Sequence, residues 1–197
     1  RSRNKFLLLL LILANIYFIV FLYSRAAYIG FGAGMLVLFA FKNRKLLLPL
    51  ILILVLWQVA LPEKAIERIK STQNEYGELD ESSERRIRIW EKGVELFKAS
   101  PLVGIGYGTF RFLNLDLRDT HNIYIKILVE QGLVGLGIFF IVIICFMKTG
   151  FSLYVDGEDG ISKGLGLGLA VCMIVLMINN FFGDRWSYFE LSGFLWV

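Results

Sequence analysis

The chain has 197 residues, of which 56% are hydrophobic and only 19% are charged. Several apolar stretches approach the roughly 20 residues that a helix needs to cross a bilayer, which excludes an ordinary soluble domain. The formal net charge of +4 does not indicate nucleic-acid binding, because the basic residues form short clusters beside apolar stretches. Such clusters are typical of membrane orientation, so composition predicts a multi-pass membrane protein in a lipid bilayer.

Residues 1–61 predict three transmembrane helices, since they hold three apolar stretches. These stretches are 6–23, 26–41 and 46–61. The first two are interrupted by Ser24 and Arg25, and together they are too long for one crossing of about 30 Å at about 1.5 Å per residue, so they predict a hairpin. The chain begins without methionine and shows no signal-peptide cleavage site, so we expect further N-terminal spans of the same protein.

Residues 62–122 are polar and nearly balanced in charge. The alternation of basic clusters between the apolar stretches predicts that this segment is an extracytoplasmic loop. Within it, the pattern predicts an amphipathic helix at about residues 84–99, with candidate N-cap residues among 80–83 and Pro101 beyond its end. The expected apolar stripe of this helix consists of Ile87, Trp90, Val94 and Phe97.

Residues 123–197 predict an interfacial helix, two transmembrane helices and an extracytoplasmic end segment. The two spans are expected at 132–147 and 164–182, joined by a loop rich in Gly and Asp at 149–163. Gly132 and Gly135 would let the chain bend before it enters the first of them. One histidine, and two cysteines that lie within apolar stretches, predict neither a disulfide nor a metal site.

His121 is the only histidine of the sequence and directly precedes a long apolar stretch. We expect Asp119 or Thr120 to cap the following helix, which would place His121 in its first turn on the face of Tyr124. Two interpretations stay open. His121 is either an interfacial residue satisfied by water or a carbonyl group, or a general base at the outer membrane surface, since imidazole exchanges protons near neutral pH.

Arginines beside the outer ends of spans are unexpected, because basic residues favour the cytoplasmic side. Arg25 either reaches the phosphates of lipid headgroups or binds an anionic lipid-linked substrate, since a guanidinium grips phosphate oxygens bidentately. In the predicted amphipathic helix, Arg86 shares a face with Trp90, four residues later. Arg85 and Arg88 are expected to be solvated.

Four stretches of the chain resemble the motifs of bacterial O-antigen ligases, in the same order. They are SRAAYIG (24–30), RIRIW (86–90), PLVGIGYGTF (101–110) and HNIYIKILVEQGLVGL (121–136). Ala26 stands where the family has a glycine after Ser-Arg. The resemblance covers roughly residues 20–147. O-antigen polymerases and related exopolysaccharide proteins share the same domain.

The resemblance implies a metal-independent, inverting glycosyltransferase that needs no cofactor. Its all-α transmembrane bundle of about five spans would be the C-terminal part of a GT-C-like fold in the bacterial cytoplasmic (inner) membrane. On the extracytoplasmic face, a glycan would pass from undecaprenyl pyrophosphate to a sugar hydroxyl of a glycan or lipid A-core acceptor. His121 would be the general base, and Arg25 and Arg86 would bind the pyrophosphate. The residues expected to support them are Asn122, Tyr124, Trp90 and Arg185.

Two alternatives remain beside the ligase interpretation. A polymerase of the same family would carry the same motifs and differ only in its acceptor. A transporter or flippase component, which is not an enzyme, would also need arginines that face an anionic cargo in the membrane. The large outer loop with an ordered helix favours an enzyme over a transporter.

Overall fold

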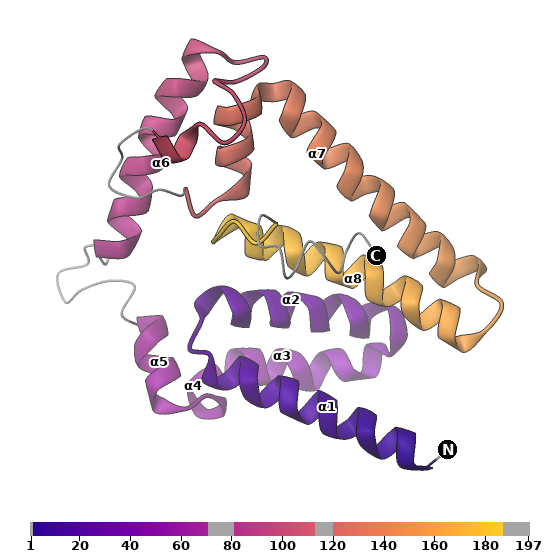
Figure 1. Cartoon of the computed structure of the whole chain (residues 1–197). Coiled ribbons are helices and arrows are strands. Elements are labelled where there is room, and N and C mark those ends of the chain that lie inside the picture. The colour runs from indigo at the N-terminus through magenta and orange to yellow at the C-terminus, as the bar shows by residue number, and fades with distance from the viewer. Residues whose placement is uncertain (1, 71–80, 113–119, 187–197) are drawn as a thin grey trace. The chain divides into compact units, whose positions relative to one another are not determined.

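The computed structural model describes residues 2–70, 81–112 and 120–186 (Figure 1). Over these ranges the chain consists of helices, turns and bends, with no strand. The all-α prediction is therefore confirmed for the described residues. The chain divides into two compact units, Arg1–Leu79 and Asp80–Val197.

The first unit contains a hairpin of two helices followed by several short ones. They are α1 (Ser2–Phe21), α2 (Arg25–Lys42), the 3₁₀ turn η1 (Arg44–Leu46), α3 (Leu47–Val55), α4 (Trp57–Ala60) and α5 (Glu63–Lys70). Ser24 is the N-cap of α2, and its hydroxyl accepts a hydrogen bond from the Ala27 N–H at 3.4 Å. The Tyr28 hydroxyl donates to the Val20 carbonyl at 2.7 Å and ties the two helices at this turn. The break expected at Ser24 and Arg25 is confirmed.

The third apolar stretch, 46–61, does not form one continuous helix. The backbone leaves helical geometry at Leu56, with φ −90° and ψ 27°, which separates α3 from α4. The nine residues of α3 extend only about 14 Å at 1.5 Å per residue, less than the thickness of a hydrocarbon core. Three transmembrane helices within residues 1–61 thus stay a prediction.

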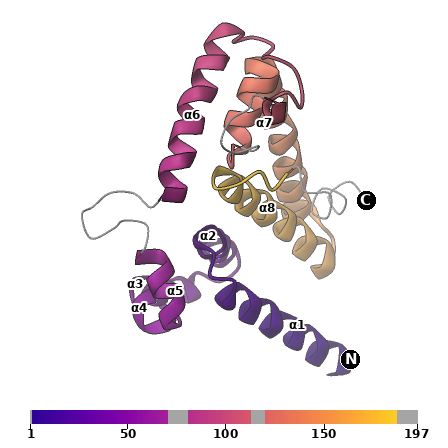
Figure 2. The ribbon, with the colours of Figure 1, turned by 60° about the vertical axis from the view of Figure 1, so that its left-hand side comes forward.

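The second unit is built on a long helical hairpin. Its elements are α6 (Glu81–Ala99), the 3₁₀ turn η2 (Phe110–Phe112), α7 (Ile123–Asp156) and α8 (Gly160–Phe181). The antiparallel α7 and α8 form this hairpin (Figure 2). They touch at Gly150 and Gly166, where a methyl group on Gly166 would lie 2.6 Å from the Gly150 carbonyl oxygen. This close packing keeps α7 helical past residue 148, so the loop expected at 149–163 is wrong in extent and shrinks to 157–159.

Three helices of the described chain are long and apolar enough to cross a membrane. They are Arg25–Lys42, Ile123–Asp156 and Gly160–Phe181, and a shorter apolar helix covers Lys5–Phe21. These helices support a membrane protein, whereas the count of five spans and the side on which the loop lies stay predictions.

The helix α6 packs against the first segment of α7, as both views show (Figures 1 and 2). Gly93 lies at this contact, since a methyl group there would lie 3.1 Å from Ile125 Cγ2. Ile89 is buried on this side, whereas Ile87 and Val94 are 38% and 42% exposed. The predicted stripe was therefore wrong for Ile87 and Val94. The prediction counted only large apolar residues, whereas the face of α6 that carries Gly93 can pack closely against α7. The helix ends at Ala99, as Pro101 predicted.

Candidate functional site

The long helix α7 is broken at Gly132, as the sequence predicted. This residue has φ 65° and ψ −163°, outside helical geometry. A methyl group on Gly132 would lie 2.3 Å from the backbone carbonyl of Leu102, and one on Gly104 would lie 2.3 Å from the carbonyl carbon of Glu130. The loop at residues 101–110 thus touches the break backbone to backbone, which only glycine permits at these two positions.

This loop also replaces the helical hydrogen bonds that the break removes. Two loop N–H groups donate to carbonyls at the end of the first α7 segment, and two N–H groups of the second segment donate to loop carbonyls. These bonds join Ile105 to Val129 (2.9 Å), Gly106 to Glu130 (2.9 Å), Leu133 to Pro101 (2.9 Å) and Val134 to Leu102 (3.1 Å). The direction of the first segment is therefore fixed by the loop.

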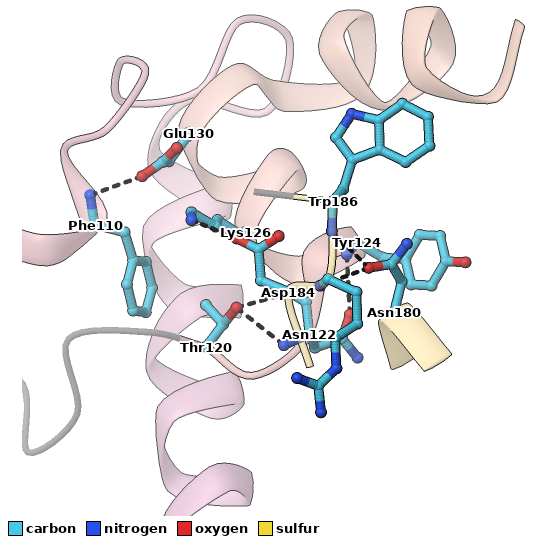
Figure 3. A network of polar contacts seen from close by, with 10 residues as sticks. Phe110, Thr120, Asn122, Tyr124, Lys126, Glu130, Asn180, Asp184 and Trp186 are labelled. Atoms are coloured by element: carbon cyan, nitrogen blue, oxygen red, sulfur yellow. Dashed lines mark hydrogen bonds and ion pairs between the residues drawn. The ribbon is translucent and has the colours of Figure 1, made fainter. Parts of the chain in front are cut away.

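The start of α7 is capped by Asn122, whose side-chain oxygen accepts hydrogen bonds from the N–H groups of Tyr124 (3.0 Å) and Ile125 (3.2 Å). The expectation that Thr120 or Asp119 is the cap was wrong, and Asp119 lies outside the described residues. Thr120 is fully buried, and its hydroxyl donates to the Asn122 carbonyl at 2.7 Å and accepts from the Asn122 N–H at 3.2 Å (Figure 3). As a result, His121 precedes the N-cap instead of lying in the first turn.

His121 occupies a strained turn. Its φ is +50°, in the left-handed region, which costs an L-residue about 1–2 kcal/mol. Its two neighbours, Thr120 and Asn122, are buried, whereas His121 itself is half-buried. The turn therefore anchors the backbone on both sides of the imidazole and leaves the side chain partly accessible.

The amphipathic helix reaches this turn through Trp90. Its indole N–H donates to the Thr120 carbonyl at 2.8 Å, directly before His121. Arg86 lies one turn earlier on α6, about 6 Å along the axis, and is half-buried. Arg88 is exposed, as expected, and pairs with a glutamate of its own helix at 3.7 Å. The structure thus ties the helix that carries Arg86 to the turn that carries His121.

Two other predicted site residues, Tyr124 and Arg185, contact α8. Tyr124 turns toward α8, where its hydroxyl donates to the Met177 carbonyl at 2.7 Å. Arg185 is exposed, and its backbone N–H donates to the Asn180 side chain at 2.8 Å. Arg25 is the first residue of α2 and belongs to the first unit, so its role beside Arg86 stays a prediction.

Three buried polar residues were given no role by the sequence. The Asp184 side chain is 2% exposed and pairs with Lys126 at 2.5 Å. Glu130 is 2% exposed and accepts a hydrogen bond from the Phe110 N–H at 3.1 Å. Asn180 is fully buried, and its side-chain oxygen accepts from the N–H groups of residues 185 and 186 (Figure 3). The available signal was Lys126 and Glu130, four residues apart in the mostly apolar first segment of α7. Ionisable residues in such membrane segments are rare and often functional.

Lys126, Glu130 and Asp184 border a cleft of about 730 Å³ in the second unit. Its wall is polar along the first segment of α7 and apolar beyond the break. The lining residues are Tyr107, Gly108, Arg111, Ile123, Lys126, Ile127, Glu130, Gln131, Gly135, Ile138, Phe139, Asp184 and Trp186. A cleft with buried charged groups at one end and aromatic surface nearby can bind a polar ligand in a fixed orientation.

A family model described as O-antigen ligase matches residues 7–140. The match extends from α1 to the second segment of α7 and includes Arg25, Arg86 and His121. No curated protein matches the chain.

Proposed function

Because the chain belongs to the O-antigen ligase family, we propose that it moves a glycan from undecaprenyl pyrophosphate to a sugar hydroxyl outside the cytoplasmic membrane. Family membership and the apolar helices support a membrane enzyme of the ligase or polymerase type. Whether the acceptor is a finished lipid-linked core or another growing glycan distinguishes a ligase from a polymerase.

The observation that carries the proposal is the position of His121. The imidazole stands on a left-handed backbone between two buried polar residues. A residue that only contacts water at the membrane surface gains nothing from such a backbone, whereas strain of this kind is found where a side chain must be held in place. The bond from Trp90 to the Thr120 carbonyl adds a second anchor. This geometry supports a general base over an interfacial histidine.

In the proposed reaction, the acceptor hydroxyl oxygen bonds to the anomeric carbon of the donor glycan. The bond from this carbon to the pyrophosphate oxygen breaks, and its electron pair leaves with the pyrophosphate. The hydroxyl proton passes to the neutral imidazole of His121. Attack from the side opposite the leaving group inverts the anomeric carbon.

Arg86 is proposed to bind the pyrophosphate and to stabilise the charge that develops as it leaves. Its half-buried position on α6, one turn from Trp90, supports this role over that of a solvated residue. The same role for Arg25 rests on the sequence resemblance alone.

The test is the variant His121→Asn in the purified full-length protein. Asparagine tolerates the left-handed backbone but does not take up a proton near neutral pH. We expect glycan transfer to fall by about 10²- to 10⁴-fold while binding of the lipid-linked donor is almost unchanged. The two readouts are transfer to acceptor, followed by gel shift of the labelled glycan, and donor binding in nanodiscs.

A matched control is Arg88→Gln, which removes an exposed charge from α6 and should leave both readouts intact. Equal loss of binding and transfer in His121→Asn would make His121 a substrate-positioning residue. Unimpaired transfer would return it to the role of an interfacial histidine.

A further inference from the structure

We infer that the cleft beside the first segment of α7 binds a sugar ring of the glycan substrates through its hydroxyl groups. This inference rests on the proposed function and adds to it a binding site that the sequence did not predict. The cleft holds about 730 Å³, within the range of about 300–1,000 Å³ typical of small-molecule sites.

The polar end of the cleft presents two buried carboxylates. Glu130 and Asp184 both line it, and they are 2% and 4% exposed. Glu130 accepts a hydrogen bond from the Phe110 N–H and Asp184 accepts one from Lys126, and these bonds hold the carboxylates in place. A carboxylate has two oxygens with about four acceptor positions, so Glu130 can accept further bonds from hydroxyl groups.

The charge of the lining favours a neutral ligand over a phosphate. Among the described lining residues, the ionisable side chains of opposite charge are Arg111 and Lys126 on one hand and Glu130 and Asp184 on the other. Lys126 is paired with Asp184 at 2.5 Å, so within the described lining the positive charges do not outnumber the negative ones. Buried carboxylates repel a pyrophosphate but accept hydrogen bonds from hydroxyl groups, which are abundant on a sugar ring.

The wall beyond the polar end is aromatic and aliphatic. Trp186 is half-buried and packs edge-on against Phe139, with ring centroids 5.4 Å apart. Tyr107, at the other side, is 84% exposed. Sugar rings carry C–H groups on one face and hydroxyl groups at the rim, so this combination of aromatic surface and carboxylates matches both parts of such a ring.

The cleft also follows the helix that His121 precedes. Ile123, the first lining residue of α7, comes two residues after His121, and Lys126 and Glu130 follow on the next turns. A ring bound along this segment therefore lies on the helix whose start carries the proposed base.

The experiment measures binding of two lipid-free glycans to the full-length protein in nanodiscs by saturation-transfer NMR and calorimetry. One probe is the glycan released from the lipid donor by mild acid, and the other is the delipidated acceptor glycan. The variant Glu130→Gln keeps the shape and the bond to Phe110 but removes the charge, and we expect affinity for one of the probes to fall by about tenfold. Tyr107→Ala, at an exposed position, should weaken the same probe without affecting folding.

The matched control is Glu95→Gln, the same chemical change on the exposed face of α6, which should leave both affinities unchanged. The probe that loses affinity in the cleft variants identifies the source of the bound sugar. Unchanged affinity in both variants, or no binding of either glycan by the wild-type protein, would overturn the inference. Glycan transfer is measured separately. If the wild-type protein transfers glycan and the cleft variants bind both probes normally, sugar binding in the cleft is refuted and the proposed function is not. If the cleft variants lose affinity but the wild-type protein transfers no glycan from any lipid-pyrophosphate donor, the proposed function is refuted and sugar binding in the cleft is not.

Discussion

The break in α7 gives the sharpest prediction about stability. Gly132→Ala adds one methyl group at a residue with φ 65° and ψ −163°. That methyl group would lie 2.3 Å from both the carbonyl carbon and the oxygen of Leu102, far inside van der Waals contact. The variant is therefore strained in its own backbone and also pushes the loop at residues 101–110 away from the helix.

The expected loss follows from two contributions. A conformation that is essentially restricted to glycine costs another residue about 1–3 kcal/mol. Moving the loop breaks the bonds from Leu133 to Pro101 and from Val134 to Leu102, and each backbone bond contributes about 0.5–1.5 kcal/mol net. Together, Gly132→Ala should lower the free energy of unfolding by about 2–6 kcal/mol.

The assay is thermal unfolding of the full-length protein in detergent, followed by intrinsic fluorescence. The control is Gly137→Ala in the same helix, where an added methyl group meets nothing within 4 Å. Alanine in a helix interior is favoured over glycine by about 1 kcal/mol, so the control should be slightly stabilised. If Gly132→Ala unfolded at the same temperature as Gly137→Ala, the claim that the loop packs directly against Gly132 would be refuted.

Three further predictions concern charge. Arg86→Lys should restore only part of the donor binding that Arg86→Ala loses, because lysine lacks the bidentate fork of arginine. Arg88→Ala should bind donor normally. The opposite result for Arg86→Ala and Arg88→Ala would reverse the assignment of the two helix faces. A cysteine at Glu95 should react with an impermeant reagent in intact cells and one at Asn43 should not, and the reverse pattern would invert the predicted topology. Hydrogen bonds from two backbone N–H groups at the start of α8 hold the pKa of Asp159 below its usual value, so its stabilisation is present above pH 3.8 and is lost as pH falls through the lowered pKa. The difference in unfolding temperature between wild type and Asp159→Ala should therefore shrink between about pH 6 and about pH 2, and a constant difference would refute the capping argument.

Features that depend on local sequence were predictable. The turn at Ser24, the stop at Pro101 and the bend at Gly132 each follow from the properties of one residue, and each is found. The family could also be recognised from short motifs, because these keep their order along the chain.

Features that depend on packing between distant segments were not predictable. The buried side of α6 carries Gly93, where an added methyl group would meet Ile125 and Val129 of another helix. The cap at Asn122 was missed because Thr120 has the same capping chemistry, whereas in the structure the Thr120 hydroxyl bonds to the backbone of Asn122 instead. Lys126 and Asp184, which form an ion pair, are 58 residues apart in the sequence. Hydropathy periodicity describes only neighbouring residues, so it does not predict this pair.

The position of His121 depends on both ends of the first α7 segment. This segment, residues 123–131, has only about two and a half turns, and a helix of that length is marginal in isolation. Its start is held by the Asn122 cap and its end by the loop bonds around Gly132. The strain of about 1–2 kcal/mol at His121 can be maintained only while both ends are fixed, because a loosened segment would let the backbone relax. Gly132→Ala should therefore reduce glycan transfer even at temperatures where the variant remains folded, although Gly132 is distant in sequence from the proposed base.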